Sequence, residues 1–293
     1  MKKILSYSLM IIGMTVFIVA CTKDKLQQNR AEITINDKDL AQVRFIHALS
    51  SNAINTVSPV VAATTPPALN FFVNGVRLNA ISSASATFTT AYGGSFPGTS
   101  ISFAGVTNGN NVFDYAVIPS GTSTVTGAMF RLTGGTSADS VISTSLNFDK
   151  WKKYTVIAAD TIPNQRFYAF EDVFVKPDTG NYAIRFINMA MNIPTVGAAP
   201  TAIDVFSRRR QTNLVSNVAY RGSSTYVESR TTYIVNGLPI SDTLEFRAAG
   251  TTTLLVQING FFPVKTRVYT FVARGVSTNV APRNLNVAGF LNQ

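Results

Sequence analysis

Two stretches of sequence, "VRFIHA" at 43–48 and "IRFINM" at 184–189, decide the fold. Each reads as a β-strand, in which successive side chains point to opposite faces. This alternation puts Val43, Phe45 and His47 on one face of the first strand. It puts Ile184, Phe186 and Asn188 on the equivalent face of the second. The likeness of the two strands predicts that the chain contains two copies of one unit.

Further matches follow the first one in the same order along the chain. They pair "ALNFF" (68–72) with "AIDVF" (202–206), "AYGGS" (91–95) with "AYRGS" (219–223), "SGTSTV" (120–125) with "AGTTTL" (249–254), and "YTVIA" (154–158) with "YTFVA" (269–273). A period of well over a hundred residues indicates two domains of one fold and not a solenoid of short repeats. The boundary is expected in "VKPDTGNY" at 175–182, where proline and glycine interrupt two strands.

Within each unit, short strands alternate with turn residues, and helical periodicity is absent after the first twenty residues. Asn74-Gly75 and Asn259-Gly260 each lie between apolar stretches, which predicts two type I′ hairpins. The expected fold class is therefore all-β, with antiparallel sheets packed face to face in two tandem immunoglobulin-like β-sandwich domains.

The composition is that of an exported β-rich protein. Only 14% of the residues are charged, whereas an average soluble protein has about 25%. The formal net charge is +10, but the basic residues are spread along the chain and no helix carries a basic stripe. We expect no nucleic-acid partner, and at most a diffuse attraction to anionic polymers of the cell envelope.

The first residues, "MKKILSYSLMIIGMTVFIVAC", have the basic start and apolar run of a secretory signal. Residues 18–21 resemble the lipobox of bacterial lipoproteins, in which the cysteine is diacylated on sulfur, the signal is cut just before it, and the new amine is acylated. An uncleaved membrane helix is the alternative, but the apolar run is slightly short for one. We therefore expect a signal peptide at 1–20, lipidation at Cys21, a polar tether at 21–39, and domains at 40–178 and 179–293. Cys21 is the only cysteine, so no disulfide is expected.

The segments "VRFIHA", "NFFVNG" (70–75) and "IPSGT" (118–122) resemble a bacterial family, the tandem domain of unknown function 4397. The resemblance implies immunoglobulin-like repeats on surface lipoproteins of the Gram-negative outer membrane, and it implies no activity. The second unit departs from the family pattern at 207–210, where "SRRR" replaces the turn, so a hairpin there is uncertain.

His47, the only histidine, could be a catalytic base, a metal ligand or a structural residue. Its counterpart is Asn188, which cannot act as a base but can hydrogen-bond nearby backbone as histidine does. A structural role explains both. Glu171 and Asp172 are adjacent on a strand and point to opposite faces, so they cannot act together on a sugar. We expect no catalysis, no cofactor and no metal site.

Three sets of residues are candidates for binding or modification. Arg208, Arg209 and Arg210 form either a docking point for acidic groups or a solvated hairpin tip. Loop aromatics could stack on sugar rings or belong to the core: Tyr92, Phe96, Tyr220 and Tyr226. Three Asp-hydroxyl-aliphatic sequences resemble O-glycosylation acceptors or are ordinary turns, at Ser140, Thr161 and Thr243. Trp151, between lysines, is expected to cap the edge of the core.

We therefore expect a non-catalytic, lipid-anchored envelope protein that binds extracellular glycan or polymer through loops at the end of a sandwich. The alternative is a structural or adhesive spacer whose partners are envelope proteins. A hydrolase is the third hypothesis, and it would require two carboxylates in one cleft.

Overall fold

The computed structural model describes residues 39–49, 69–79, 90, 92–97, 115–130, 138–160, 164–191, 202–231, 240–276 and 284–292. All of them belong to one compact unit, Lys38–Gln293. No helix that could cross a membrane occurs within these ranges. The predicted signal peptide and Cys21 lie outside the described residues.

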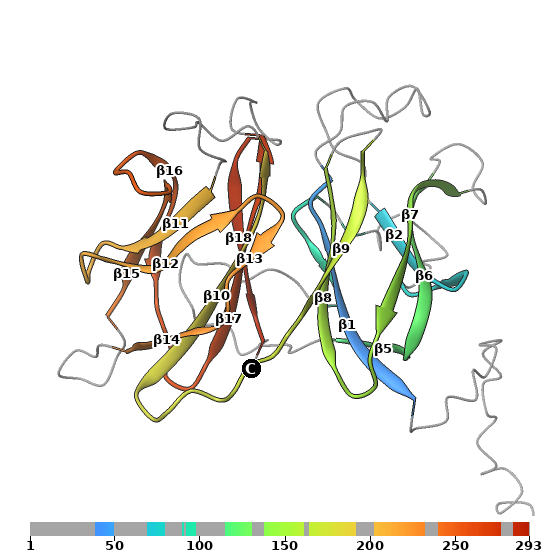
Figure 1. Cartoon of the computed structure of the whole chain (residues 1–293), viewed down its shortest axis with the longest axis horizontal. Coiled ribbons are helices and arrows are strands. Elements are labelled where there is room, and N and C mark those ends of the chain that lie inside the picture. The colour runs from blue at the N-terminus through green and yellow to red at the C-terminus, as the bar shows by residue number, and fades with distance from the viewer. Residues whose placement is uncertain are drawn as a thin grey trace, which may run out of the picture. The chain divides into compact units, whose positions relative to one another are not determined.

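The first sandwich consists of two sheets (Figure 1). One sheet contains β1 (Leu40–His47), β4 (Ser95–Phe96), β5 (Ala116–Pro119), β8 (Lys153–Ala159) and β9 (Arg166–Glu171). The other contains β2 (Leu69–Val73), β3 (Val76–Arg77), β6 (Gly121–Phe130) and β7 (Ala138–Phe148). The buried core between them includes Phe45 and Phe71, whose rings stack with centroids 4.9 Å apart.

The second sandwich repeats this arrangement. One sheet contains β10 (Asn181–Met191), β13 (Gly222–Ser223), β14 (Val227–Arg230), β17 (Val268–Val276) and β18 (Asn286–Leu291). The other contains β11 (Ala202–Ser207), β12 (Thr212–Ala219), β15 (Asp242–Ala248) and β16 (Leu254–Phe261). Phe186, the counterpart of Phe45, lies 5.3 Å from Phe246 in the core. The predicted all-β sandwich architecture is therefore confirmed.

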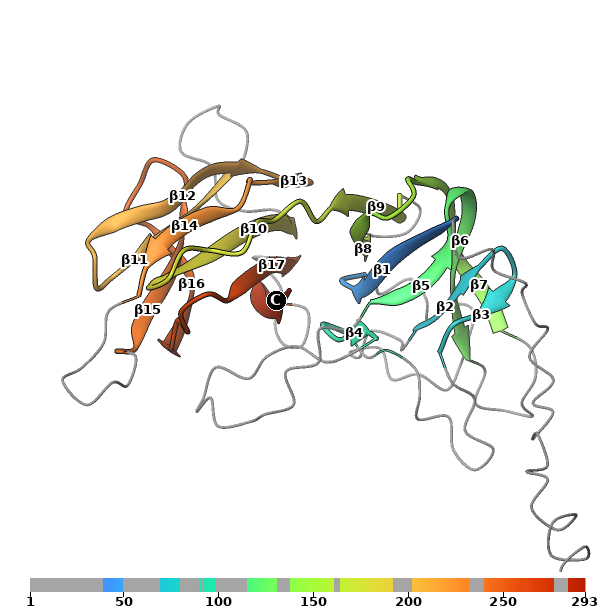
Figure 2. The same cartoon turned by 90° about the horizontal axis from the view of Figure 1, so that it is seen from below.

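The sequence pattern predicted antiparallel sheets, but two of the sheets also contain a parallel pair of strands. β1 runs parallel to β8, and β10 runs parallel to β17; each pair lies side by side in both views (Figures 1 and 2). The chain crosses to the other sheet between the two members of each pair, so the later strand can return in the same direction. Local sequence patterns do not reveal such distant pairing.

The two sandwiches share the register of their strands. Val43 lies opposite Tyr154 in the first sandwich, as Ile184 lies opposite Tyr269 in the second. One of the five sequence matches is wrong, because 120–125 begins β6 whereas 249–254 joins β15 to β16. By its pairing with β11, the strand equivalent to β6 is β15.

One of the two predicted hairpin turns is present. Asn74 and Gly75 have positive φ angles of 50° and 79° and connect β2 to β3. Asn259-Gly260 instead lies inside β16, where the register with β15 shifts. Gly260, with φ of 70°, fits a β-bulge, which requires the same left-handed conformation as a tight turn.

Candidate functional site at the contact between the two sandwiches

The strand alternation that sends Phe45 and Phe186 into the cores sends their neighbours to the opposite faces of the same sheets. There, nine buried residues from both sandwiches form one apolar cluster. Its members are Ile46, Ala48, Ile157, Ala159, Ile187, Met189, Val272, Ala288 and Phe290. The β1–β8–β9 sheet and the β10–β17–β18 sheet therefore bury their outer faces against each other.

An arginine from each opening strand crosses this contact reciprocally. The guanidinium of Arg44 donates to the backbone carbonyl of Leu291 at 2.8 Å. That of Arg185 donates to the carbonyl of Glu171 at 3.0 Å. Leu291 ends β18 and Glu171 ends β9, the last strands of the two sandwiches. The contact therefore has an approximate twofold relationship that follows the sequence repeat.

A tyrosine ring covers each of these guanidinium groups. Arg44 lies 4.7 Å from the ring centroid of Tyr115, and Arg185 lies 4.7 Å from that of Tyr226. Tyr115 precedes β5 and Tyr226 precedes β14, so the two rings occupy equivalent places. Burial raises the pKa of both phenols well above the ordinary value, so both remain protonated.

One carboxylate breaks the symmetry. Asp172 forms a buried ion pair with Arg185 and also accepts hydrogen bonds from the hydroxyls of Tyr115 at 2.6 Å and Thr155 at 2.9 Å. Burial, the largest single effect, would lower the pKa of Arg185. The charge and hydrogen bond of Asp172, together with the neighbouring Tyr226 and Tyr115, outweigh it and raise that pKa. The equivalent place in the second sandwich holds the neutral Asn292, which donates to the Tyr115 oxygen at 2.9 Å.

A second polar cluster lies around Asp160, which is 2% exposed. Its carboxylate accepts hydrogen bonds from the hydroxyls of Tyr168, at 2.6 Å, and Tyr220, and forms an ion pair with Arg221 at 2.9 Å. Tyr168 belongs to the first sandwich, whereas Tyr220 and Arg221 belong to the second. This cluster therefore also joins the two sandwiches.

The counterparts of Asp160 and Arg221 are two glycines, Gly275 and Gly93. All four residues have positive φ angles, between 63° and 95°. At the glycine end, the guanidinium of Arg274 lies 4.5 Å from the ring centroid of Tyr92 and fills the space where a Gly93 side chain would be. An ion pair thus joins the sandwiches at one end, and a cation–π contact joins them at the other.

The sugar-stacking platform expected from the sequence is not assembled as one surface. Tyr92 contacts Arg274, Tyr220 bonds Asp160, and Tyr226 packs against Arg185 and Phe174. Phe96 pairs with Phe45 along β1 and packs against the first core. Three of the four aromatics therefore lie in the contact between the sandwiches, where other side chains cover their faces.

The "SRRR" segment forms the tip of the β11–β12 hairpin, and its three arginines are exposed. Arg208 forms an ion pair with Glu245 at 3.1 Å. The backbone amide of Arg209 donates to Asp242 at 3.0 Å, and that of Arg210 donates to Ser207 Oγ at 3.1 Å. The hairpin that was uncertain from sequence is therefore present.

His47, the last residue of β1, and Asn188, near the end of β10, make the same hydrogen bond. The amide of Leu49 donates to His47 Nδ1 at 3.2 Å, and the amide of Ala190 donates to Asn188 Oδ1 at 3.1 Å. Both side chains are completely buried. Each residue thus holds the backbone two positions ahead, the structural role that the sequence predicted for both.

The three O-glycosylation candidates have different positions. Ser140 lies within β7 and Thr243 within β15, so both are in strands and not in the turns that the sequence suggested. Thr161 lies outside the described residues. Glu171 and Asp172 diverge as expected: the side chain of Glu171 bonds Lys152 at the surface, while that of Asp172 is buried.

Sequence reasoning missed the residues that join the sandwiches, above all Arg44, Arg185 and Tyr115. The repeated motif could have indicated them, because arginine is its second residue in both copies and points to the face opposite the phenylalanine. Among the described residues, no three metal-ligating acidic, histidine or cysteine side chains come together. The buried ion pair of Arg185 with Asp172 and the reciprocal arginine–carbonyl hydrogen bonds are suited to holding two bodies together.

Comparisons with known proteins give a family and no activity. No curated protein matches the chain. Among solved structures, it is similar to the Bacillus anthracis TIE protein at 7% identity and a TM-score of 0.20. That similarity covers 80% of this chain and 34% of the other, so the chain spans about a third of that protein's length. The family described as "Domain of unknown function (DUF4397)" matches residues 41–199, more than half of the chain. The protein therefore belongs to the domain of unknown function 4397 family.

Proposed function

We propose that this protein is a non-catalytic lipoprotein of the cell envelope that acts as a stiff structural or adhesive spacer. The observation that carries the proposal is the reciprocal contact in which Arg44 and Arg185 each donate to the last strand of the other sandwich. The signal-like sequence at 1–21 supports an exported chain anchored by lipid at the outer membrane or cell surface.

The energetics of the contact favour a stiff unit. Separating the sandwiches would expose the nine-residue apolar cluster and would leave Arg185 and Asp172 without their partner. Breaking a buried ion pair by removing one member typically costs about 3–5 kcal/mol. A tandem protein joined only by its linker would bend freely, and it would not hold a partner at a fixed distance from the membrane.

Distance measurement between the sandwiches tests the spacer proposal. Spin labels are placed on introduced cysteines at Ser145 in β7 and Ser216 in β12, both exposed, in the full chain carrying Cys21→Ser. We expect a single narrow distance distribution that broadens when Asp172→Ala is added. The surface substitution Glu171→Ala is the matched control and should leave the distribution narrow. A broad distribution in the chain that keeps Asp172 would contradict a spacer.

Binding to an anionic envelope polymer is a second candidate function. The exposed arginines of the β11–β12 hairpin tip favour it, because guanidinium groups bind phosphate and carboxylate in a forked geometry. Two features weaken the case for this candidate. Arg208 is already paired with Glu245, and hydrogen bonds within the hairpin hold the backbone of Arg209 and Arg210. If replacing all three arginines with glutamine leaves retention on anionic polysaccharide unchanged, this candidate is wrong.

A further inference from the structure

Trp151, the only tryptophan in the chain, lies on the surface. It is 71% exposed, so the expectation that it caps the edge of the core is wrong. It sits in the turn between β7 and β8 with a positive φ of 65°, a conformation that bulky side chains rarely adopt. A large exposed apolar side chain on a strained backbone is a reason to look for function.

The second sandwich shows that the turn does not require tryptophan. Thr266 occupies the equivalent place with a φ of 63°. The amide of Trp151 donates to the carbonyl of Leu40 at 2.8 Å, and that of Thr266 donates to the carbonyl of Asn181 at 2.6 Å. The same turn with the same anchoring bond therefore forms around a small hydroxyl residue. The indole of Trp151 serves neither the turn nor the core.

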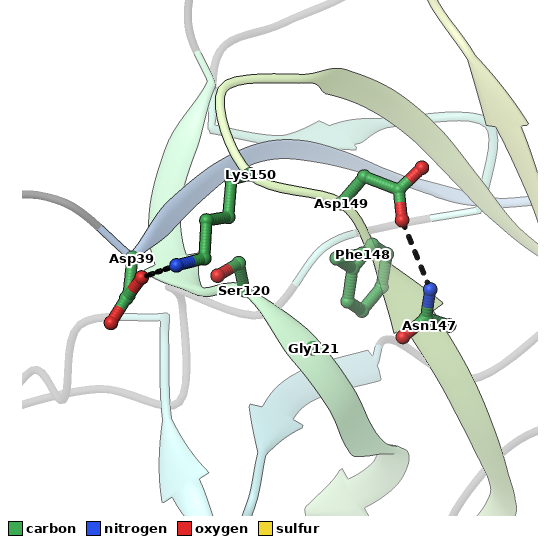
Figure 3. Close-up of a pocket in the computed structure, with 7 residues that line it drawn as sticks. All are labelled: Asp39, Ser120, Gly121, Asn147, Phe148, Asp149 and Lys150. Atoms are coloured by element: carbon green, nitrogen blue, oxygen red, sulfur yellow. Dashed lines mark hydrogen bonds and ion pairs between the residues drawn. The ribbon is translucent and has the colours of Figure 1, made fainter.

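A pocket of about 370 Å³ lies beside this turn (Figure 3). It is lined by Asp39, Ser120, Gly121, Asn147, Phe148, Asp149 and Lys150. Trp151 follows Lys150 in the chain, and its amide bonds the residue after Asp39, so its backbone is fixed at the edge of the pocket. Phe148 is fully buried and belongs to the first core, which gives the pocket a rigid wall.

The remaining lining offers hydrogen-bonding groups, most of which are already paired with one another. Lys150 pairs with Asp39, and the Asn147 amide donates to Asp149 at 3.1 Å (Figure 3). Lys152 forms an ion pair with Asp149 at 2.9 Å, and its hydrogen bond lowers the pKa of that carboxyl, which stays ionised at neutral pH. Among the lining residues, two carboxylates and one ammonium group leave a net charge of −1.

We propose that Trp151 and this pocket form a binding site for a neutral sugar, such as one hexose unit of a polysaccharide. The indole offers a flat apolar face for the C–H side of a pyranose ring. The carboxylates of Asp39 and Asp149, the Asn147 amide and the Ser120 hydroxyl provide acceptors and donors for the ring hydroxyls. The net negative charge of the lining disfavours uronic acids and other anionic sugars. This site is separate from the contact between the sandwiches, and it does not depend on the spacer proposal.

Affinity electrophoresis of the full chain tests this site. The chain is run through native gels that contain starch, dextran, galactomannan, xylan or the anionic polymer alginate. We expect retardation by at least one neutral polysaccharide, and Trp151→Thr, which places the residue of the second sandwich in the same turn, should weaken it about tenfold. Trp151→Tyr keeps a ring and should retain most of the binding. Asp149→Asn should weaken binding without removing the ring.

Because Trp151 is the only tryptophan, its fluorescence gives an independent readout. The oligosaccharide that corresponds to the retarding polymer should protect the indole from acrylamide quenching at saturating concentration. Thr266→Ala, in the equivalent turn, is the matched control and should bind as the unmodified chain does. The proposal is wrong if no neutral polymer retards the chain, if only alginate does, or if Trp151→Thr binds equally well.

Discussion

Arg185 and Asp172 form a buried ion pair, with side chains only 3% and 0% exposed. The pair joins the opening strand of the second sandwich to the residue that follows the last strand of the first. They are thirteen positions apart in the sequence, on either side of the segment that connects the two sandwiches. The linker therefore begins at a residue fixed by this ion pair. The pair holds the second sandwich against the sheet of the first sandwich from which the linker leaves.

Asp172→Ala should reduce the free energy of unfolding by about 3–5 kcal/mol, because it leaves the Arg185 guanidinium buried without its counter-charge. Urea denaturation followed by circular dichroism measures the change. The exposed neighbour Glu171, replaced by alanine, should change stability by about 0.5 kcal/mol or less. Equal effects of the two substitutions would mean that the ion pair contributes nothing to the contact.

Gly93→Ala should force Arg274 away from Tyr92, because an added side-chain carbon would occupy the place of its guanidinium. Gly250→Ala is the matched control: its φ of 73° is similar to the 81° of Gly93, and it has open space around it. We expect Gly93→Ala to cost about 1 kcal/mol more than the control, in the range of a cation–π contact. The difference should vanish when both substitutions are compared in an Arg274→Ala background; a persistent difference would exclude this explanation.

Alkaline pH should weaken the cluster around Asp160. Burial, followed by the hydrogen bond to Asp160, raises the pKa of Tyr168 from 10.0 to about 12. A group whose pKa is raised by folding stabilises the protein fully below its unfolded value and loses this contribution as the pH rises towards the folded value. Stability should therefore fall between pH 10 and 12, and the fall should be shallower in Tyr168→Phe. Urea midpoints across this range provide the measurement, and parallel profiles for the two proteins would refute the assignment.

Cys21→Ser should abolish lipidation of the exported chain, because the proposed acyl chains are attached to this only cysteine. Labelling of expressing cells with a tagged fatty acid, followed by detection of label on the chain, measures the effect. We expect label on the unsubstituted chain and none on the Cys21→Ser chain. An unsubstituted chain without label would contradict lipidation and favour the uncleaved membrane helix.

The sequence was sufficient to predict what depends on local pattern. Alternation in "VRFIHA" and "IRFINM" put Phe45 and Phe186 on equivalent faces of their strands, and the structure places both in the cores. The match of His47 with Asn188 predicted a role that both side chains can fill. The Asn74-Gly75 turn followed from the conformational freedom of those residues.

Features that depend on distant pairing were missed or wrong. Asn259-Gly260 is the same dipeptide as Asn74-Gly75, but it lies within β16, because β16 continues to pair with β15 beyond it. The parallel pairing of β1 with β8 requires a strand more than a hundred residues away. The destination of Arg44 and Arg185 was hidden for the same reason: alternation shows that they leave the core, but only the packed structure shows what they meet.

Pulsed hydrogen exchange with mass spectrometry across a urea series tests most directly whether the two sandwiches form one coupled body. The peptides to compare are the equivalent central strands, "YTVIA" at 154–158 and "YTFVA" at 269–273. We expect both to become exchangeable at the same urea concentration in the unsubstituted chain, and at different concentrations in Asp172→Ala. Two separate midpoints in the unsubstituted chain would show that the sandwiches unfold independently and would contradict the account.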